Sequence, residues 1–236
     1  MPRLIFRTCL LAGLWLCAQQ ACSQAAPIPD TLEQRIVACA ACHGKKGEGL
    51  RANEYYPRIA GKPAGYLYNQ LVSFRDRRRH SPVMNHMVAY LSDDYLREIA
   101  QYYAGLPASF PPAVAAPPGP VVARGESLMT RGDPSRKIPA CIECHGKSLT
   151  GLEPAIPALI GLDSQYIAAQ LGAWRNKTRR AKAPDCMADI ASLLGPGDIS
   201  AVAAWLAVQA PTPQSAAPLP AGSLKLPMEC GGTDGR

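Results

Sequence analysis

The sequence predicts an all-α protein with two tandem domains produced by internal duplication. Three observations support this prediction. Apolar residues recur at helical spacing in several stretches. The motif Cys39-Ala-Ala-Cys42-His43 returns as Cys141-Ile-Glu-Cys144-His145. The residues that follow each motif match at a nearly constant offset, which indicates a repeated unit.

The repeated motif has the spacing of a c-type haem attachment site. Two thiols three residues apart form thioether bonds to one porphyrin, and the adjacent histidine is the proximal iron ligand. A single copy would also suit a redox dithiol or half of a zinc site, but two copies, each followed by Gly-Lys, favour haem. We therefore expect two covalently bound haem c groups. Their attachment residues are Cys39, Cys42 and His43, and then Cys141, Cys144 and His145.

The helices of the two copies can be paired residue by residue. A first helix, capped by Asp30 or Thr31, is expected to carry the first motif. At an offset of 100, the helical residues Tyr66, Gln70, Leu71, Phe74 and Arg75 match Tyr166, Gln170, Leu171, Trp174 and Arg175. A closing helix, beginning at Ser92 in the first copy, places these apolar residues on one face: Leu96, Ile99, Ala100 and Tyr103, then Ile199, Val202, Ala203 and Leu206. Domains this small bury little apolar surface, so haem is expected to complete each core.

Composition suggests five segments. Residues 1–26 resemble a signal peptide, with two arginines, an apolar run and small residues near Ala25, so export to the periplasm is expected. A retained anchor and lipidation of Cys22 are alternatives. The first domain covers 27–107 and the second 121–210. Residues 108–120 are a Pro-rich linker or an ordered strap on both domains, and 211–236 form a Pro- and Gly-rich tail, expected to be extended.

The second axial ligand of each iron is predicted to be a methionine. Met187 lies eight residues before Gly195, at the start of the second closing helix, and Met84 lies eight residues before Ser92. The spacings from the motif histidines, 41 and 42 residues, agree as well. Met87, His80 and His86 remain alternatives in the first copy. Pro57 and Pro157 are candidates for holding the proximal imidazoles, because a backbone carbonyl can accept a hydrogen bond from the ring nitrogen that does not bind the metal.

Together these motifs make the chain resemble the class I cytochromes c, specifically the dihaem cytochrome c4 type, over about residues 30 to 208. The resemblance implies two helical domains related by a pseudo-twofold axis, with haems close enough to exchange electrons. It also implies His/Met ligation by His43 with Met84 and His145 with Met187, and carbonyl acceptance by Pro57 and Pro157. The linker and tail are longer than this family requires.

Two cysteines outside the haem motifs, Cys186 and Cys230, remain in the chain beyond the signal segment. In an oxidising compartment such a pair usually forms a disulfide, which would clamp the tail over the methionine side of the second haem. A buried thiol, or a link to a partner through Cys230, is the alternative.

The predicted function is single-electron transfer between respiratory or dehydrogenase complexes and a terminal oxidase or reductase, rather than enzymatic catalysis. The alternatives are a subunit of a larger dehydrogenase or oxidase complex, and a small dihaem peroxidase-like enzyme. The formal charge is +7, and basic runs precede each methionine at 75–80 and 175–182. These runs are either ordinary solvated surface or a docking face for an acidic redox partner, which could be membrane-bound. Nucleic acid is an unsuitable partner, since no aromatic residues alternate with these charges.

Overall fold

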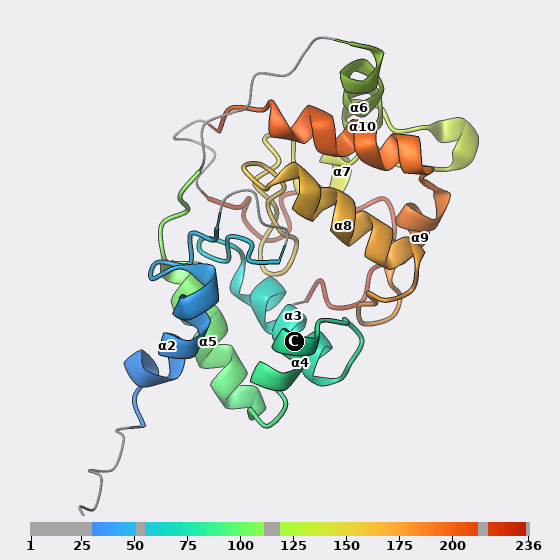
Figure 1. Ribbon diagram of the computed structural model, residues 1–236. Coiled ribbons are helices and arrows are strands. Elements are labelled where there is room, and N and C mark those ends of the chain that lie inside the picture. Colours follow the sequence, from blue (N-terminus) through green and yellow to red (C-terminus); the bar gives the residue numbers. More distant parts are fainter. Residues whose placement is uncertain (1–29, 51–54, 111–118, 212–216, 235–236) are drawn as a thin grey trace, which may run out of the picture. The chain divides into compact units, whose positions relative to one another are not determined.

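The computed structural model describes residues 30–50, 55–110, 119–211 and 217–234 (Figure 1). The predicted signal segment, residues 1–26, and residues 111–118 of the predicted linker lie outside the described residues. The all-α prediction is confirmed. The elements in order are α2 (Leu32–His43), α3 (Ala64–Arg75), α4 (Pro82–Met87), α5 (Asp93–Gly105), α6 (Pro120–Thr130), the 3₁₀ turn η1 (Pro134–Arg136), α7 (Ile142–His145), α8 (Ser164–Arg175), α9 (Cys186–Leu193) and α10 (Pro196–Ala207). We call residues 35–110 the first half and 119–234 the second half.

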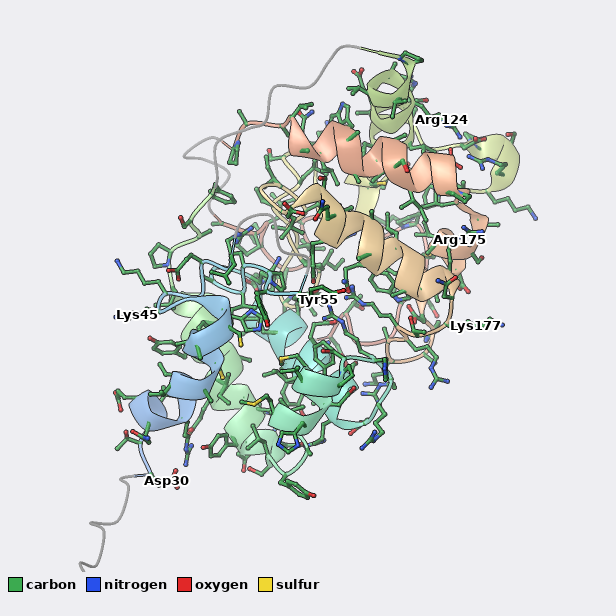
Figure 2. The ribbon with its side chains drawn as sticks, viewed as in Figure 1. Asp30, Lys45, Tyr55, Arg124, Arg175 and Lys177 are labelled. Carbon is green, nitrogen blue, oxygen red and sulfur yellow. A yellow bond between two sulfur atoms is a disulfide. The ribbon has the colours of Figure 1, made fainter. Side chains whose placement is uncertain are left out.

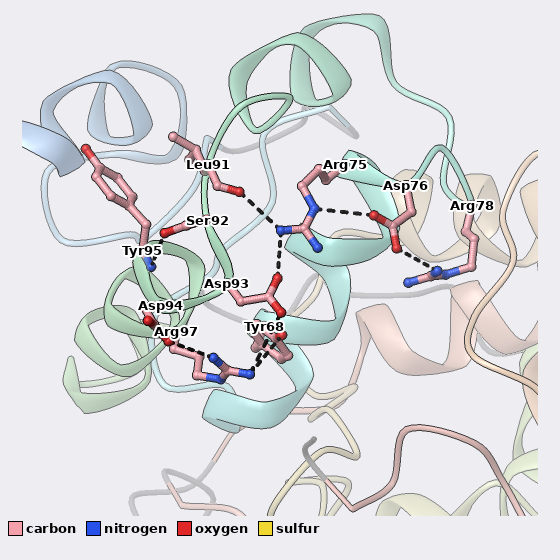
Figure 3. A network of polar contacts seen from close by, with 10 residues as sticks. All are labelled: Tyr68, Arg75, Asp76, Arg78, Leu91, Ser92, Asp93, Asp94, Tyr95 and Arg97. Atoms are coloured by element: carbon pink, nitrogen blue, oxygen red, sulfur yellow. Dashed lines mark hydrogen bonds and ion pairs between the residues drawn. The ribbon is translucent and has the colours of Figure 1, made fainter.

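The core of the first half forms where α3 packs against α5. Ser92 caps the start of α5 (Asp93–Gly105) as predicted, with its hydroxyl accepting a hydrogen bond from the Tyr95 amide at 3.3 Å. The predicted core face is confirmed, because Leu96, Ile99, Ala100 and Tyr103 are all buried. Arg75, at the end of α3, donates to the Asp93 carboxylate at 2.7 Å and to the Leu91 carbonyl at 3.1 Å (Figure 3). These contacts fix the end of α3 against the start of α5.

The core of the second half forms where α10 packs against α6 and α8 (Figure 1). Its predicted residues Ile199, Val202, Ala203 and Leu206 are buried. Helix α6 is an addition to the predicted elements. It crosses α10 closely at Gly125, where a Cβ atom would lie 2.1 Å from the Ala201 carbonyl oxygen and 2.7 Å from the Trp205 Cβ. Only a residue without a side chain permits this approach.

The two copies deliver their haem motifs differently. The first motif ends the 12-residue helix α2, whereas the second lies at the four-residue helix α7, separated from α6 by η1. Pro139, two residues before Cys141, explains the interruption, since proline removes a backbone donor and disfavours helical geometry before it. A ring of ion pairs holds the intervening segment, in which Arg124 and Arg136 each contact both Asp133 and Asp198 at 2.9 to 3.0 Å.

The described part of the tail contains no helix and lies against the fold. Leu219 exchanges backbone hydrogen bonds with Gly151 and Glu153, at 2.9 and 2.8 Å. Cys230 forms a disulfide with Cys186, as predicted. The Asn69 side chain then donates to the Gly232 carbonyl at 2.7 Å, so the tail crosses the second half and reaches α3 of the first. These contacts, which composition does not encode, hold the tail in place.

Residues 108–110 favour the ordered strap over a free linker. Ala108 contacts Gly61 of the first half, and Phe110 contacts its counterpart Gly161 of the second. Within the described residues no single helix is long and apolar enough to cross a membrane; only α9 and α10 taken together, with a bend of 111° between them, reach that length and composition.

Candidate functional site: two haem-binding sites

The two motif histidines are held in the same way. His43 and His145 are buried, and their Nδ1 atoms lie 2.9 Å from the Pro57 carbonyl oxygen and 2.8 Å from the Pro157 carbonyl oxygen. These are the predicted proline contacts. Nδ1–H donates to the carbonyl, which leaves Nε2 as the nitrogen that can bind a metal. Burial lowers the pKa of both imidazoles, which keeps them in the neutral form that a metal requires.

Two glycines make this hydrogen bond possible. Gly49 and Gly151 each follow their motif histidine by six residues, have positive φ angles of 77° and 83°, and donate a backbone hydrogen bond to that histidine's carbonyl. A Cβ atom on either would lie 2.7 Å from the carbonyl carbon of Pro57 or Pro157. The close approach needs glycine. Sequence reasoning connected neither glycine with its histidine, although their equal spacing from the two histidines is visible in the chain.

The second site surrounds a cavity of about 490 Å³. Its wall includes both motif thiols, the imidazole and the predicted thioether ligand, namely Cys141, Cys144, His145 and Met187. Most of the remaining wall is apolar and includes Leu128, Ile138 and Leu171. Trp174 also lines it, and the buried Nε1–H of this tryptophan has no acceptor within the described part of the chain. This donor set, around a largely apolar space with one polar atom free, fits a covalently attached haem.

The alternatives to haem fit poorly. Burial raises the pKa of the Cys141 thiol to about 12, so at neutral pH it is protonated and not the reactive thiolate of a redox dithiol. No cluster of three or more metal-binding histidine, cysteine or acidic side chains occurs in the residues that the structure describes.

In the first half, the environments of the candidate axial ligands differ. Met84 is partly buried and packs against the same core as Cys39, on the inward side of α4. Met87 is 38% exposed, and His80 and His86 are exposed. An axial ligand must face the interior, so these environments favour Met84, which stays a prediction.

A polar network joins the two halves, and in it each half supplies the same three residue types: an arginine, a glutamine and a tyrosine. Arg79 and Arg179 are buried, and each donates to both Gln70 and Gln170 at 2.6 to 3.1 Å. Arg79 also donates to the Tyr166 hydroxyl at 3.3 Å, and Arg179 to the Tyr66 hydroxyl at 3.4 Å. The tyrosines and glutamines mark the repeat in the sequence, but their spacing did not predict that they meet.

This network corrects the expectation that both basic runs, 75–80 and 175–182, lie entirely on the surface. Arg79 and Arg179 lie between the halves and cannot dock a partner. Arg75 and Arg78 are paired with Asp93 and Asp76 (Figure 3). The basic side chains that remain exposed, here called the basic surface set, are Arg77, Arg175, Lys177, Arg180 and Lys182. Figure 2 shows Arg175 and Lys177 at the end of α8.

Comparison with known proteins adds to this geometry. No protein-family model matches the chain. It is 41% identical over 179 residues to the thiosulfate dehydrogenase electron acceptor of Thiomonas intermedia, covering 76% of this chain and 82% of the relative. It is 33% identical over 176 residues to cytochrome c4 of Pseudomonas aeruginosa, covering 74% and 85%. The chain belongs to the cytochrome c4 family.

Solved structures agree with this membership. Reduced cytochrome c4 from Pseudomonas stutzeri superposes with a TM-score of 0.65 at 28% identity, over 75% of this chain and 95% of that one. The thiosulfate dehydrogenase TsdBA from Marichromatium purpuratum superposes with a TM-score of 0.62 at 35% identity, over 72% of this chain but only 36% of that one. The protein is therefore a dihaem electron carrier with two tandem cytochrome c domains and two covalently attached haem c groups, not an enzyme.

Proposed function

We propose that this cytochrome c4-family protein accepts single electrons from a thiosulfate dehydrogenase in the periplasm and delivers them to a respiratory oxidase or reductase. The observation that carries the proposal is the second cavity, where two thiols, an oriented imidazole and a thioether line one apolar space. A bound haem c supplies a one-electron iron couple. The residues of the chain decide how that couple is held and what can reach it.

The proposed ligands act in pairs. Cys39 and Cys42, and Cys141 and Cys144, attach the two haems through thioether bonds. His43 and His145 bind the irons through Nε2, while the carbonyls of Pro57 and Pro157 fix the ring orientation. Met84 and Met187 would each supply a thioether as the second protein ligand of an iron, which would exclude small molecules from the metal and raise its reduction potential.

The partner is inferred from relatives and from charge. Two curated relatives, from Thiomonas intermedia and Stutzerimonas stutzeri, are named as electron acceptors of thiosulfate dehydrogenase, at 41% and 38% identity. The basic surface set offers a positively charged docking face to an acidic partner. The predicted export segment at residues 1–26 supports the periplasm as the compartment.

A second candidate is a subunit of a larger complex. The thiosulfate dehydrogenase TsdBA resembles this chain over only 36% of its own length, so a unit of this kind is also found within a longer chain. Size-exclusion chromatography of the natively produced protein separates the two cases, because a free carrier elutes at the mass of one chain while a subunit elutes with its complex.

The proposed function is tested on purified holoprotein. We expect two haems per chain, ferrous spectra unchanged by carbon monoxide, and rapid reduction by a thiosulfate dehydrogenase supplied with thiosulfate. A carbon monoxide-sensitive haem would contradict His/Met ligation at that iron. Reduction no faster than that of an unrelated cytochrome c would contradict the proposed partner.

A further inference from the structure

Four basic side chains are buried near the boundary between the halves: Arg58, Lys62, Arg79 and Arg179 are between 4% and 9% exposed. Within the described residues, none of these four side chains forms an ion pair with a carboxylate. Buried charges without a counter-charge are costly, so this cluster requires anions from another source. Haem carries propionate carboxylates, which are anions of the required kind.

The cluster is not symmetric. Arg79 and Arg179 are counterparts in the two copies, at the offset of 100. Arg58 and Lys62 are not matched, because the same offset leads to Ala158 and Leu162. The first half therefore contributes two buried basic residues that have no basic counterpart in the second half. Arg58 reaches across the boundary, with its guanidinium donating to the Ile160 carbonyl at 3.3 Å and to the Ala60 carbonyl at 2.7 Å.

Lys62 belongs by sequence to the first half but lines the cavity of the second. The same cavity wall contains Lys62, His145 and both motif cysteines of the second copy, together with Leu162, the counterpart of Lys62. Its Nζ atom lies 5.8 Å from the centroid of the Tyr66 ring, beside the arginine network. A charge in this position acts on the second haem site through protein rather than through bulk water.

We propose that Lys62 is a tuning residue that raises the reduction potential of the second haem relative to the first. A fixed positive charge favours the ferrous over the ferric state, because the ferrous site carries one positive charge fewer. Burial and the neighbouring arginines lower the pKa of the Lys62 amine, so its charge is kept by the anion that the cluster requires, such as a haem propionate. A buried charge held in this way acts more strongly than a surface lysine and is shielded from salt. The consequence is that one electron leaving the ferrous iron of the first site is drawn to the ferric iron of the second.

The proposal rests on the proposed His/Met dihaem carrier, and its test separates the two. Lys62→Gln removes the charge, Lys62→Leu reproduces the second copy, and Lys62→Arg keeps the charge. Lys147→Gln is the matched control, because Lys147 lies two residues after His145 but is exposed. Each holoprotein is titrated potentiometrically while haem-methyl NMR resonances of the two ferric haems are followed separately. Haem content and carbon monoxide binding are measured on the same samples.

For Lys62→Gln and Lys62→Leu, we expect the equilibrium constant for electron transfer from the first haem to the second to fall at least tenfold, about 59 mV for a one-electron couple. Lys62→Arg should restore the wild-type value, and Lys147→Gln should change it less than twofold. Equal shifts at both haems, or a shift no larger than that of Lys147→Gln, would overturn the role of Lys62. If such a result came from protein with two carbon monoxide-insensitive haems, the proposed function would stand. If Lys62→Leu fails to retain haem, the potentials of Lys62→Gln alone test the proposal.

Discussion

Arg79 and Arg179, one from each half, lie opposite each other in an antiparallel backbone bridge. On either side of it the His80 amide donates to the Thr178 carbonyl at 2.9 Å, and the Arg180 amide donates to the Arg78 carbonyl at 2.7 Å. Each buried guanidinium also lies over an aromatic ring of its own half, Phe74 at 4.4 Å and Trp174 at 3.7 Å from the ring centroid. The contact that joins the halves is thus built from counterpart residues.

Arg179→Met should destabilise the holoprotein. The substitution removes one of the two guanidinium donors to each of Gln70 and Gln170 and the donor to the Tyr66 hydroxyl, and the loss of such hydrogen bonds costs about 1–3 kcal/mol. We expect the free energy of unfolding to fall by about 2 kcal/mol in denaturant titrations. Arg180→Met is the control, because Arg180 is exposed, and it should change stability by less than about 0.5 kcal/mol. Equal effects of the two variants would argue against a structural role for the network.

Met84→Ala should open the first iron, whereas Met87→Ala should not. Met84 is turned into the core and Met87 is 38% exposed on the same helix. We expect carbon monoxide to bind one haem per chain in Met84→Ala and none in Met87→Ala, and the potential of the first haem to fall only in the former. Carbon monoxide binding in Met87→Ala alone would assign the ligand to Met87.

Removing the disulfide should loosen the tail and the helix that carries Met187. The Cys186–Cys230 bond closes a loop with a sequence separation of 44, for which the chain-entropy model gives about 4 kcal/mol. We expect Cys230→Ser to lose about 2–4 kcal/mol of unfolding free energy. Because α9 begins at Cys186, the second haem should also become measurably sensitive to carbon monoxide. If Cys230→Ser were as stable as the wild-type protein with its disulfide formed, the tail would be held by its other contacts.

A pair of helical glycines tests the crossing of α6 and α10. Gly125→Ala places a methyl group against the Ala201 carbonyl, and overpacking of this kind costs about 1–3 kcal/mol. Gly172→Ala, in α8, meets nothing within 4 Å and should stabilise the protein by about 0.5–1 kcal/mol, because alanine loses less backbone entropy in a helix. Thermal unfolding of both variants should therefore give shifts of opposite sign.

The basic surface set should control the rate of partner docking. Lys177→Glu with Arg180→Glu reverses two exposed charges, so reduction by thiosulfate dehydrogenase should slow, and the wild-type rate should itself fall as ionic strength rises. Arg131→Glu, at an exposed position just after α6, is the matched control. A rate independent of salt would contradict docking through this set.

Local patterns predicted the elements closest to the chemistry. Helical periodicity identified the buried faces of α5 and α10, and the duplication identified the prolines whose carbonyls meet His43 and His145. These features depend on spacing within a short stretch, where helix geometry relates sequence directly to position. Helix α6 escaped prediction because its packing depends on the contact of Gly125 with Ala201 of α10, which lies 76 residues later in the chain.

The sequence by itself determined the cofactor and the duplication, and it predicted the disulfide that the structure shows between the cysteines left over from the haem motifs. Each is covalent or periodic and can be counted along the chain. Only the tertiary structure decided that Arg79 and Arg179 are buried between the halves and that Lys62 enters the cavity of the other copy. The physical reason is that the sequence identifies a basic residue but does not show whether its side chain is exposed to water or buried against a distant segment. Its burial is set by packing between residues about 100 positions apart.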